Sequence, residues 1–128
     1  MAKRCITAKN APPAMGPYSH GVAAGNLLFL SGQVPLAADG SGPQHGTIDE
    51  EARLVLSNVK AILEESGSSM DQVVKVTAYL SDMNDFGSFN TVYAEFFPDN
   101  CPARTCIQAG RLPLDFKVEV EVIALLPE

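Results

Sequence analysis

Several groups that enzymes commonly use are scarce or missing from this sequence. It contains only two histidines, His20 and His45, and they do not stand at a spacing typical of metal ligands. It has no glycine-rich phosphate-binding loop, and its spacing supports no serine–histidine–aspartate arrangement. Any chemistry must therefore use arginine, glutamate, tyrosine, serine, asparagine or backbone groups. Such groups suit reactions in which binding and a positioned water are sufficient, and we expect no metal site.

Cysteines and long apolar runs are also scarce. The three cysteines are odd in number and match no zinc pattern, so reduced thiols in a cytosolic-type compartment are the simplest interpretation. No apolar run approaches the length of a membrane span. Lys3, Arg4 and Lys9 make the N-terminus basic, as in a mitochondrial transit peptide, but Pro12 and Pro13 interrupt that pattern. We interpret these residues as the start of the folded domain and expect a cytoplasmic protein, leaving a mitochondrial pool open.

Acidic residues outnumber basic ones, and the net charge is −6. An acidic surface repels phosphate backbones, which disfavours nucleic acid as a partner. Charged residues make up 19% of the chain and hydrophobic residues 46%, so the 128 residues can bury a core and still leave a surface compatible with self-association. We expect residues 1–128 to form one domain, without a membrane partner.

Local patterns predict an alternation of strands and helices. Thr47 and Glu50 form a capping-box pattern that begins a helix, and Gly67 is a natural end for it. Gly25 and Asn26 stand between two apolar segments, which predicts a hairpin. Periodicity predicts strands at residues 3–7, 22–24, 27–30, 73–80, 103–109 and 117–126, and helices at 47–67 and 85–97.

The apolar faces of these elements predict how they pack. In the final strand one face is apolar throughout, and the other carries Glu119, Glu121, Ile123 and Leu125. The strand at 73–80 is expected to place Val74, Val76, Ala78 and Leu80 on one face. The second helix is expected to bury Phe86, Phe89, Val92, Tyr93, Phe96 and Phe97. The element order fits an α+β sandwich with both helices on one face of the sheet. The opposite sheet face then needs a cover, and another copy of the chain would provide one.

Arg104 is an isolated cation at the start of a predicted strand. The nearest other basic residue is Arg111, and no acidic residue lies between Asp99 and Asp115. A guanidinium can grip a carboxylate through two parallel hydrogen bonds, a geometry that lysine does not copy. From the residues alone, a surface ion-pair partner that contributes little stability is the commoner alternative.

Seven short blocks, in the same order and at the same spacing, resemble one family. They are Gly16-Pro17-Tyr18-Ser19, Leu30-Ser31-Gly32-Gln33-Val34-Pro35, Val74-Lys75-Val76-Thr77 with Leu80-Ser81-Asp82-Met83, Phe89-Asn90-Thr91-Val92-Tyr93, Pro102-Ala103-Arg104-Thr105-Cys106, Arg111-Leu112-Pro113 and Val118-Glu119-Val120-Glu121. Together they cover nearly the whole chain. The sequence resembles the Rid (reactive intermediate deaminase, YjgF-type) family, and its eukaryotic, fungal-type members most closely.

The resemblance implies a fold, an assembly and a reaction. The fold would be a chorismate-mutase-like α+β sandwich with a mixed sheet, assembled as a homotrimer with sites between subunits. The reaction would be hydrolysis of 2-imino acids, such as 2-iminobutanoate and 2-iminopropanoate, to 2-oxo acids and ammonia, without cofactor or metal. By position, Arg104 matches the arginine that binds the substrate carboxylate, and Glu119 the acid that orients water. The positions that match the family's pocket lining are Tyr18, Ser31, Gly32, Asn90 and Cys106. Tyr18 or Ser31 is also a candidate to hydrogen-bond the departing nitrogen.

Each pocket position also has a purely structural interpretation. Tyr18 can serve as a loop anchor, and Ser31 with Gly32 as a strand end. Asn90 can cap or cross-link the second helix. Cys106 fits a small buried residue better than a nucleophile.

Two further questions stay open at this level. Glu119 and Glu121 lie on one strand face, so alternation does not separate them, and both can be charges on an edge strand. A non-catalytic, chaperone-like or 2-oxo-acid-binding trimer is the alternative function. An endoribonuclease or translation inhibitor is disfavoured, because the chain is acidic and lacks a basic stripe.

The sequence departs from the family pattern at a few positions. His20 and Glu51 stand where glutamine is common, and Gln108 stands where glutamate is usual. None of these changes removes a proposed catalytic group, although Gln108 lies close enough to Cys106 in sequence to alter the polarity of the pocket.

Overall fold

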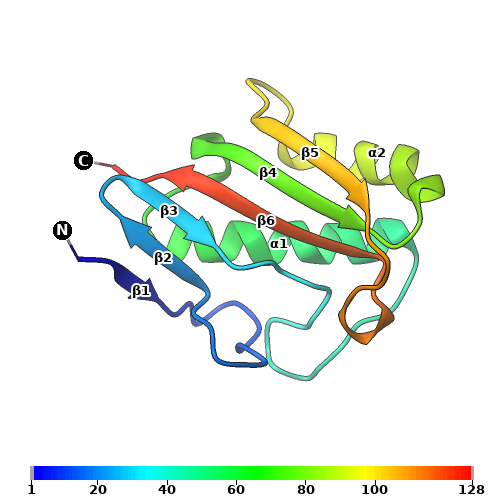
Figure 1. Ribbon diagram of the computed structural model, residues 1–128, viewed down its shortest axis with the longest axis horizontal. Helices are drawn as coiled ribbons and strands as arrows, with labels where there is room; N and C mark the ends of the chain where they lie inside the picture. Colours follow the sequence, from blue (N-terminus) through cyan, green and yellow to red (C-terminus); the bar gives the residue numbers. More distant parts are fainter. Residues whose placement is uncertain (1, 128) are drawn as a thin grey trace.

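A single twisted sheet organises the molecule (Figure 1). The computed structural model describes residues 2–127, with β1 (Arg4–Ile6), β2 (Gly21–Ala24), β3 (Leu27–Leu30), α1 (Ile48–Glu65), β4 (Val73–Leu80), α2 (Phe86–Phe96), β5 (Ala103–Gln108) and β6 (Val118–Leu125). The strands stand in the order β1-β2-β3-β6-β4-β5. β4 and β5 pair in parallel, and the other neighbouring strands pair antiparallel, so the predicted mixed sheet is confirmed.

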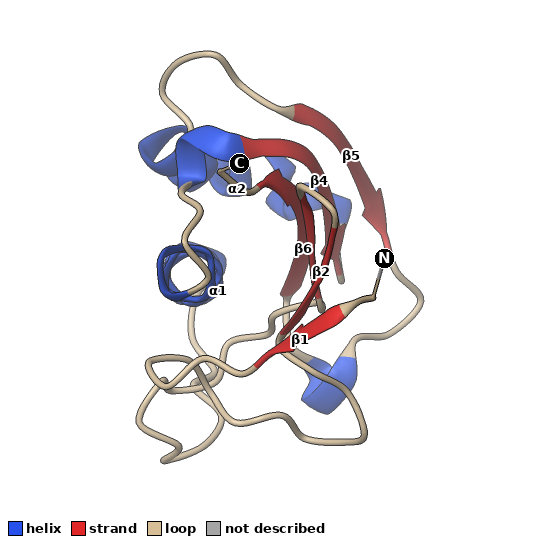
Figure 2. Cartoon of the chain, turned by 90° about the vertical axis from the view of Figure 1, so that its left-hand side faces the viewer, coloured by secondary structure: helices blue, strands red, loops and turns tan. Residues whose placement is uncertain are grey.

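Both helices cover the same face of this sheet (Figure 2). α1 begins with the predicted capping box, in which the Thr47 hydroxyl accepts from the Glu50 N–H and the Glu50 carboxylate accepts from the Thr47 N–H. The apolar stripe of α1 is completely buried at Ala52, Val55, Leu56, Val59, Ile62 and Leu63. This stripe packs on the alternating apolar face of β6, so the predicted α+β arrangement is confirmed. Among residues 2–127, no helix combines the length and apolar character needed to cross a bilayer.

The predictions for two residues, the strand face of Val74 and the burial of Phe86, are wrong. The pairing of β4 with β6 shifts between Val73 and Lys75, and this bulge buries Val73 and leaves Val74 40% exposed. After the bulge the predicted alternation holds, with Val76, Ala78 and Leu80 buried. Phe86, the first residue of α2, is 36% exposed, because its ring lies beside Arg104 of the edge strand and outside the buried cluster.

Strand pairing fixes the positions of two segments that carry candidate site residues, Ser31-Gly32 after β3 and Arg104 on β5. Just beyond β3, Gln33 and Val120 exchange backbone hydrogen bonds of 2.8 and 3.1 Å, which continues the sheet alongside the start of β6. The segment between, Ser31-Gly32, is therefore held against β6. At the far edge, the parallel pairing of β5 with β4 sets Arg104 opposite Val76.

Candidate functional site

Strand register brings Gly32 and Glu119 into contact. A Cβ built at Gly32 would overlap the Oε2 atom of Glu119 and would stand 3.0 Å from its Cδ atom. The backbone of Gly32 is outside the left-handed region. Glycine is therefore required here for the close approach of a carboxylate and not for a special backbone angle.

These two residues belong to a pocket of about 310 Å³, on the sheet face that the helices leave uncovered. Its lining residues are Met15, Tyr18, Ser31, Gly32, Val34, Pro113 and Glu119. The Tyr18 hydroxyl accepts a hydrogen bond from the Met15 N–H (3.1 Å), which leaves its own hydrogen for another partner. The Ser31 hydroxyl donates to the Ser19 carbonyl oxygen (2.7 Å) and keeps its lone pairs as acceptors. The pocket thus places a donor, an acceptor and a carboxyl group around one space.

The structure separates the two acids that alternation leaves equivalent. Burial is the main cause that raises the pKa of Glu119, and the charge of Glu121 raises it further. Glu121 instead accepts a hydrogen bond of 2.6 Å from the Tyr79 hydroxyl, and this bond raises the pKa of Tyr79. Glu119 therefore faces the pocket, whereas Glu121 is engaged outside it.

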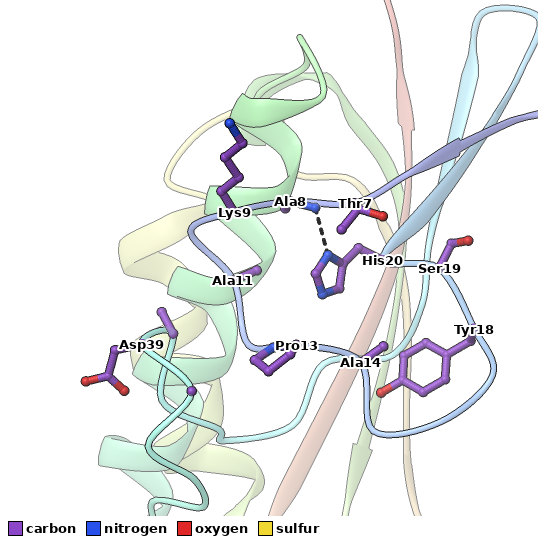
Figure 3. Close-up of a pocket in the computed structure, with 12 residues that line it drawn as sticks. Thr7, Ala8, Lys9, Ala11, Pro13, Ala14, Tyr18, Ser19, His20 and Asp39 are labelled. Atoms are coloured by element: carbon purple, nitrogen blue, oxygen red, sulfur yellow. Dashed lines mark hydrogen bonds between the residues drawn. The ribbon is translucent and has the colours of Figure 1, made fainter.

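His20 fastens the loop that carries Tyr18 (Figure 3). Nδ1 of the buried ring accepts from the Ala8 N–H (2.8 Å), and Nε2 donates to the Pro12 carbonyl oxygen (2.7 Å). Both ring nitrogens are thereby used in one neutral tautomer, with the hydrogen on Nε2. The pocket of about 390 Å³ drawn in Figure 3 is lined in part by this histidine and shares Tyr18 with the smaller pocket. Since both ring nitrogens are engaged, His20 supports the loop and offers no free nitrogen to a ligand.

The remaining candidates gather around the edge strand. Arg104 and Cys106 stand opposite Val76 and Ala78 in the parallel pairing of β5 with β4, so their side chains share the helix-covered face. Asn90 is half-buried on α2, the helix whose rings meet the arginine. Arg104 and Cys106 thus form a second polar group, separate from the pocket of Glu119, and Asn90 lies on the neighbouring helix.

Arg104 keeps its hydrogen-bond donors available. Within the described residues, its guanidinium makes no ion pair and no hydrogen bond. The guanidinium lies instead over the Tyr93 ring, with the Cζ atom of Arg104 4.7 Å from the ring centre. Within residues 2–127 the structure thus gives Arg104 no ion-pair partner, and its free donors are suited to binding an anion.

Cys106 lacks the features of an activated nucleophile. Burial raises the pKa of its thiol, and the nearby Arg104 lowers it only in part. A reactive cysteine requires the opposite, a pKa depressed enough to give thiolate. The part of the chain that the structure describes also contains no cluster of histidine, cysteine and carboxylate side chains that could hold a metal ion.

Within one chain, the pocket of Glu119 and the polar group around Arg104 lie apart. Glu119 stands on β6 opposite Tyr79 of β4, on the uncovered face, whereas Arg104 projects to the helix face. The pocket therefore has a carboxyl group without the arginine, and the arginine lies near no pocket acid. Sequence patterns predict Phe89 and Tyr93 only as core, although their shared helix face with Phe86 is a signal that these rings point the same way.

The fold and these two polar groups define a class: a small α+β protein with both helices on one sheet face and a polar group on each face. The family model described as Endoribonuclease L-PSP matches residues 8–126. The chain belongs to this family, which is the Rid (YjgF-type) family that its motifs resemble.

Several relatives are similar to this chain along most of their length. The 2-iminobutanoate/2-iminopropanoate deaminase of Escherichia coli is 41% identical over 125 residues, covering 95% of this chain and 97% of that protein. The mitochondrial protein MMF1 of Saccharomyces cerevisiae is 46% identical over 120 residues, covering 94% of this chain and 82% of that protein. The crystal structure of E. coli TdcF with bound serine has a TM-score of 0.92 at 40% identity, covering 97% of this chain and 99% of that chain. The family thus includes proteins named as deaminases, alongside the endoribonuclease of its description.

Proposed function

We propose that this protein hydrolyses 2-imino acids to 2-oxo acids and ammonia, without cofactor or metal, with 2-iminobutanoate and 2-iminopropanoate as substrates. The observation that carries the proposal is Arg104, a guanidinium held over aromatic rings with no carboxylate partner in the described chain. A 2-imino acid offers the matching carboxylate next to the C=N bond that water attacks. The names of the family's deaminases support this choice.

The proposed chemistry uses Glu119 as the acceptor of a proton from water. Water oxygen bonds to the imine carbon, one water proton passes to the Glu119 carboxylate, and the C=N electron pair moves to nitrogen, which takes that proton from Glu119 to give the carbinolamine. Glu119 then accepts the proton of the carbinolamine hydroxyl and passes it to the amino nitrogen, the C–N bond breaks, and ammonia leaves the 2-oxo acid. Tyr18 donates to the departing nitrogen, and Ser31 and Gly32 line the pocket beside Glu119. Cys106 and Asn90 would line the part of the site that comes with Arg104. Imine hydrolysis is already fairly fast in water, so positioning alone gives a useful acceleration.

We further propose a homotrimer in which the two polar groups meet between subunits. Arg104 and Glu119 occupy opposite faces of one sheet, so a neighbour is the simplest source of the missing half. The uncovered face also exposes apolar side chains, with Phe29 41% and Ile107 47% exposed. Another copy of the chain would cover them.

Glutamine substitution of the two acids tests the reaction. An amino-acid oxidase generates the imine, and its decay is followed with and without this protein. Glu119→Gln is expected to lower kcat/KM about 10²- to 10⁴-fold, the usual contribution of general-base catalysis. Glu121→Gln is the matched control, because it removes the same charge from the same strand face outside the pocket, and it should retain activity. Equal losses in both variants would contradict the assignment of Glu119, and a wild type that binds 2-oxobutanoate without accelerating decay would identify a non-catalytic binding protein.

The pH profile of the same assay gives a second readout. Glu119 must be ionised to accept a proton, so activity is lost as the pH falls through its pKa. Because that pKa is raised, the acid limb lies above the ordinary carboxyl range of about 4.3. Glu121→Gln removes one cause of the rise and should move the limb to lower pH. A limb that does not move would argue that another group titrates.

Mixed trimers test the shared site. Arg104→Ala and Glu119→Ala subunits, each inactive alone, are refolded together in equal amounts. If each site takes Arg104 from one subunit and Glu119 from its neighbour, about one quarter of the wild-type activity returns after random assembly. If both residues act within one chain, none returns. Light scattering that gives a monomer mass at micromolar concentration would also contradict the trimer.

The endoribonuclease in the family's description is not the function we propose here. With a net charge of −6, the chain would repel an RNA backbone. His20, one of the two histidines, has both ring nitrogens engaged. RNA cleavage that persists through purification and is lost in a point variant would overturn this view.

A further inference from the structure

We propose that Phe86, Phe89 and Tyr93 form an aromatic cradle that positions Arg104, with Tyr93 as the principal positioning residue. The inference rests on the proposed function, because it concerns the arginine assigned to the substrate carboxylate. The guanidinium carbon lies 4.7 Å from the ring centre of Tyr93, 5.6 Å from that of Phe86 and 5.9 Å from that of Phe89. The rings come from α2 and the arginine from β5, so the packing of helix on sheet sets their arrangement.

A cradle of rings differs from an ion pair in what it leaves free. The face of an aromatic ring attracts a cation through its quadrupole and does not consume N–H donors. Arg53 and Arg111, in contrast, each make a contact with a carboxylate, at 2.6 Å to Glu95 and 2.7 Å to Asp115. Arg104 is thus oriented without being neutralised, and its planar fork remains open to a carboxylate.

The Tyr93 ring is rigidly supported. Tyr93 is only 7% exposed, and its ring packs against those of Phe89 and Phe97 at centre-to-centre distances of 5.6 and 4.6 Å. Its hydroxyl is buried and has no hydrogen-bond partner within residues 2–127. Burial raises the pKa of this hydroxyl to about 12, so the ring stays neutral beside the cation. In the cradle the face of the ring acts on Arg104, and the hydroxyl is dispensable.

Leucine and phenylalanine substitutions separate the ring from the hydroxyl. Phe86→Leu removes an exposed ring of the cradle with little risk to folding, and KM for the imine should rise roughly three- to tenfold with kcat retained. Tyr93→Leu should raise KM more, if it folds. Tyr93→Phe keeps the ring and should keep KM within about twofold of the wild type. Phe96→Leu is the matched control, since Phe96 lies on α2 without contacting Arg104.

Nuclear magnetic resonance of the Arg104 Nε–Hε group gives a readout that does not depend on activity. Its signal is identified by its loss in Arg104→Lys. Ring currents of the cradle shift this proton, so the signal should move in Phe86→Leu and stay in place in Phe96→Leu. Binding of 2-oxobutanoate, measured by calorimetry, should weaken in parallel with the rise in KM.

The outcomes distinguish this inference from the proposed function. If the signal moves in Phe86→Leu but KM and 2-oxobutanoate binding do not change, the rings do not position the arginine for its anion, and the inference is overturned. A Tyr93→Phe variant as impaired as Tyr93→Leu would make the hydroxyl the operative group and would also overturn it. A wild type that neither hydrolyses imines nor binds 2-oxobutanoate overturns the proposed function, and a signal unmoved by Phe86→Leu overturns the cradle itself.

Discussion

Replacement of Arg104 by lysine is expected to lower kcat/KM for imine hydrolysis about 10- to 100-fold in a protein that still folds. Lysine keeps the positive charge but cannot offer two parallel N–H donors to a carboxylate. Loss of one hydrogen bond to a charged group costs about 1.5–3 kcal/mol, and every 1.4 kcal/mol is a factor of about ten. Arg104→Ala, which removes the charge as well, should cost about 10³-fold. The coupled assay of imine decay measures both.

The control for this prediction is Arg53→Lys. Arg53 also offers a planar fork to a carboxylate, that of Glu95, but on the exposed helix surface. Exposed pairs contribute little, so activity and melting temperature should remain near those of the wild type. Calorimetry with 2-oxobutanoate should show weaker binding only for the Arg104 variants. Full activity and binding in Arg104→Lys would remove the bidentate role of the arginine.

Gly32→Ala is expected to lower kcat/KM about 10²-fold without unfolding the protein. The added methyl group would overlap Glu119 Oε2, so the carboxyl group must move away. The atom in conflict is the end of a flexible side chain in a pocket, so the shift costs little stability. A displacement of about 1 Å from the productive geometry is enough to cost a factor of this size in rate. Activity and the melting temperature are measured on the same preparation.

Gly110→Ala is the matched control, because a Cβ at Gly110 meets no atom within 4 Å and should leave activity unchanged. A double variant sharpens the test. Gly32→Ala combined with Glu119→Gln should cost little more than Glu119→Gln alone, since both act on one carboxyl group. Additive losses would show that Gly32 acts through something other than Glu119.

Local patterns in the sequence predicted the elements and the general fold. The capping box at Thr47, the hairpin turn at Gly25 and the alternation from Val118 onward all appear in the structure. Each depends on residues that are neighbours along the chain, whose hydrogen bonds and side-chain directions are set within a turn or a strand. The absence of an acid near Arg104 in the sequence likewise indicated an unpaired cation, and its guanidinium makes no ion pair within residues 2–127.

The division of the candidate site was decided only by the tertiary structure. Alternation places Glu119 and Glu121 on one strand face, and only the register with Gln33 and Tyr79 directs one acid to the pocket and occupies the other. The bulge that buries Val73 in place of Val74 likewise arises from the pairing of β4 with β6. A strand's sequence specifies which side chains share a face, but the partner strand and its register determine what lies opposite them. For that reason the sequence could identify Arg104 and Glu119 separately, whereas strand pairing determines that their side chains lie on opposite faces of the sheet.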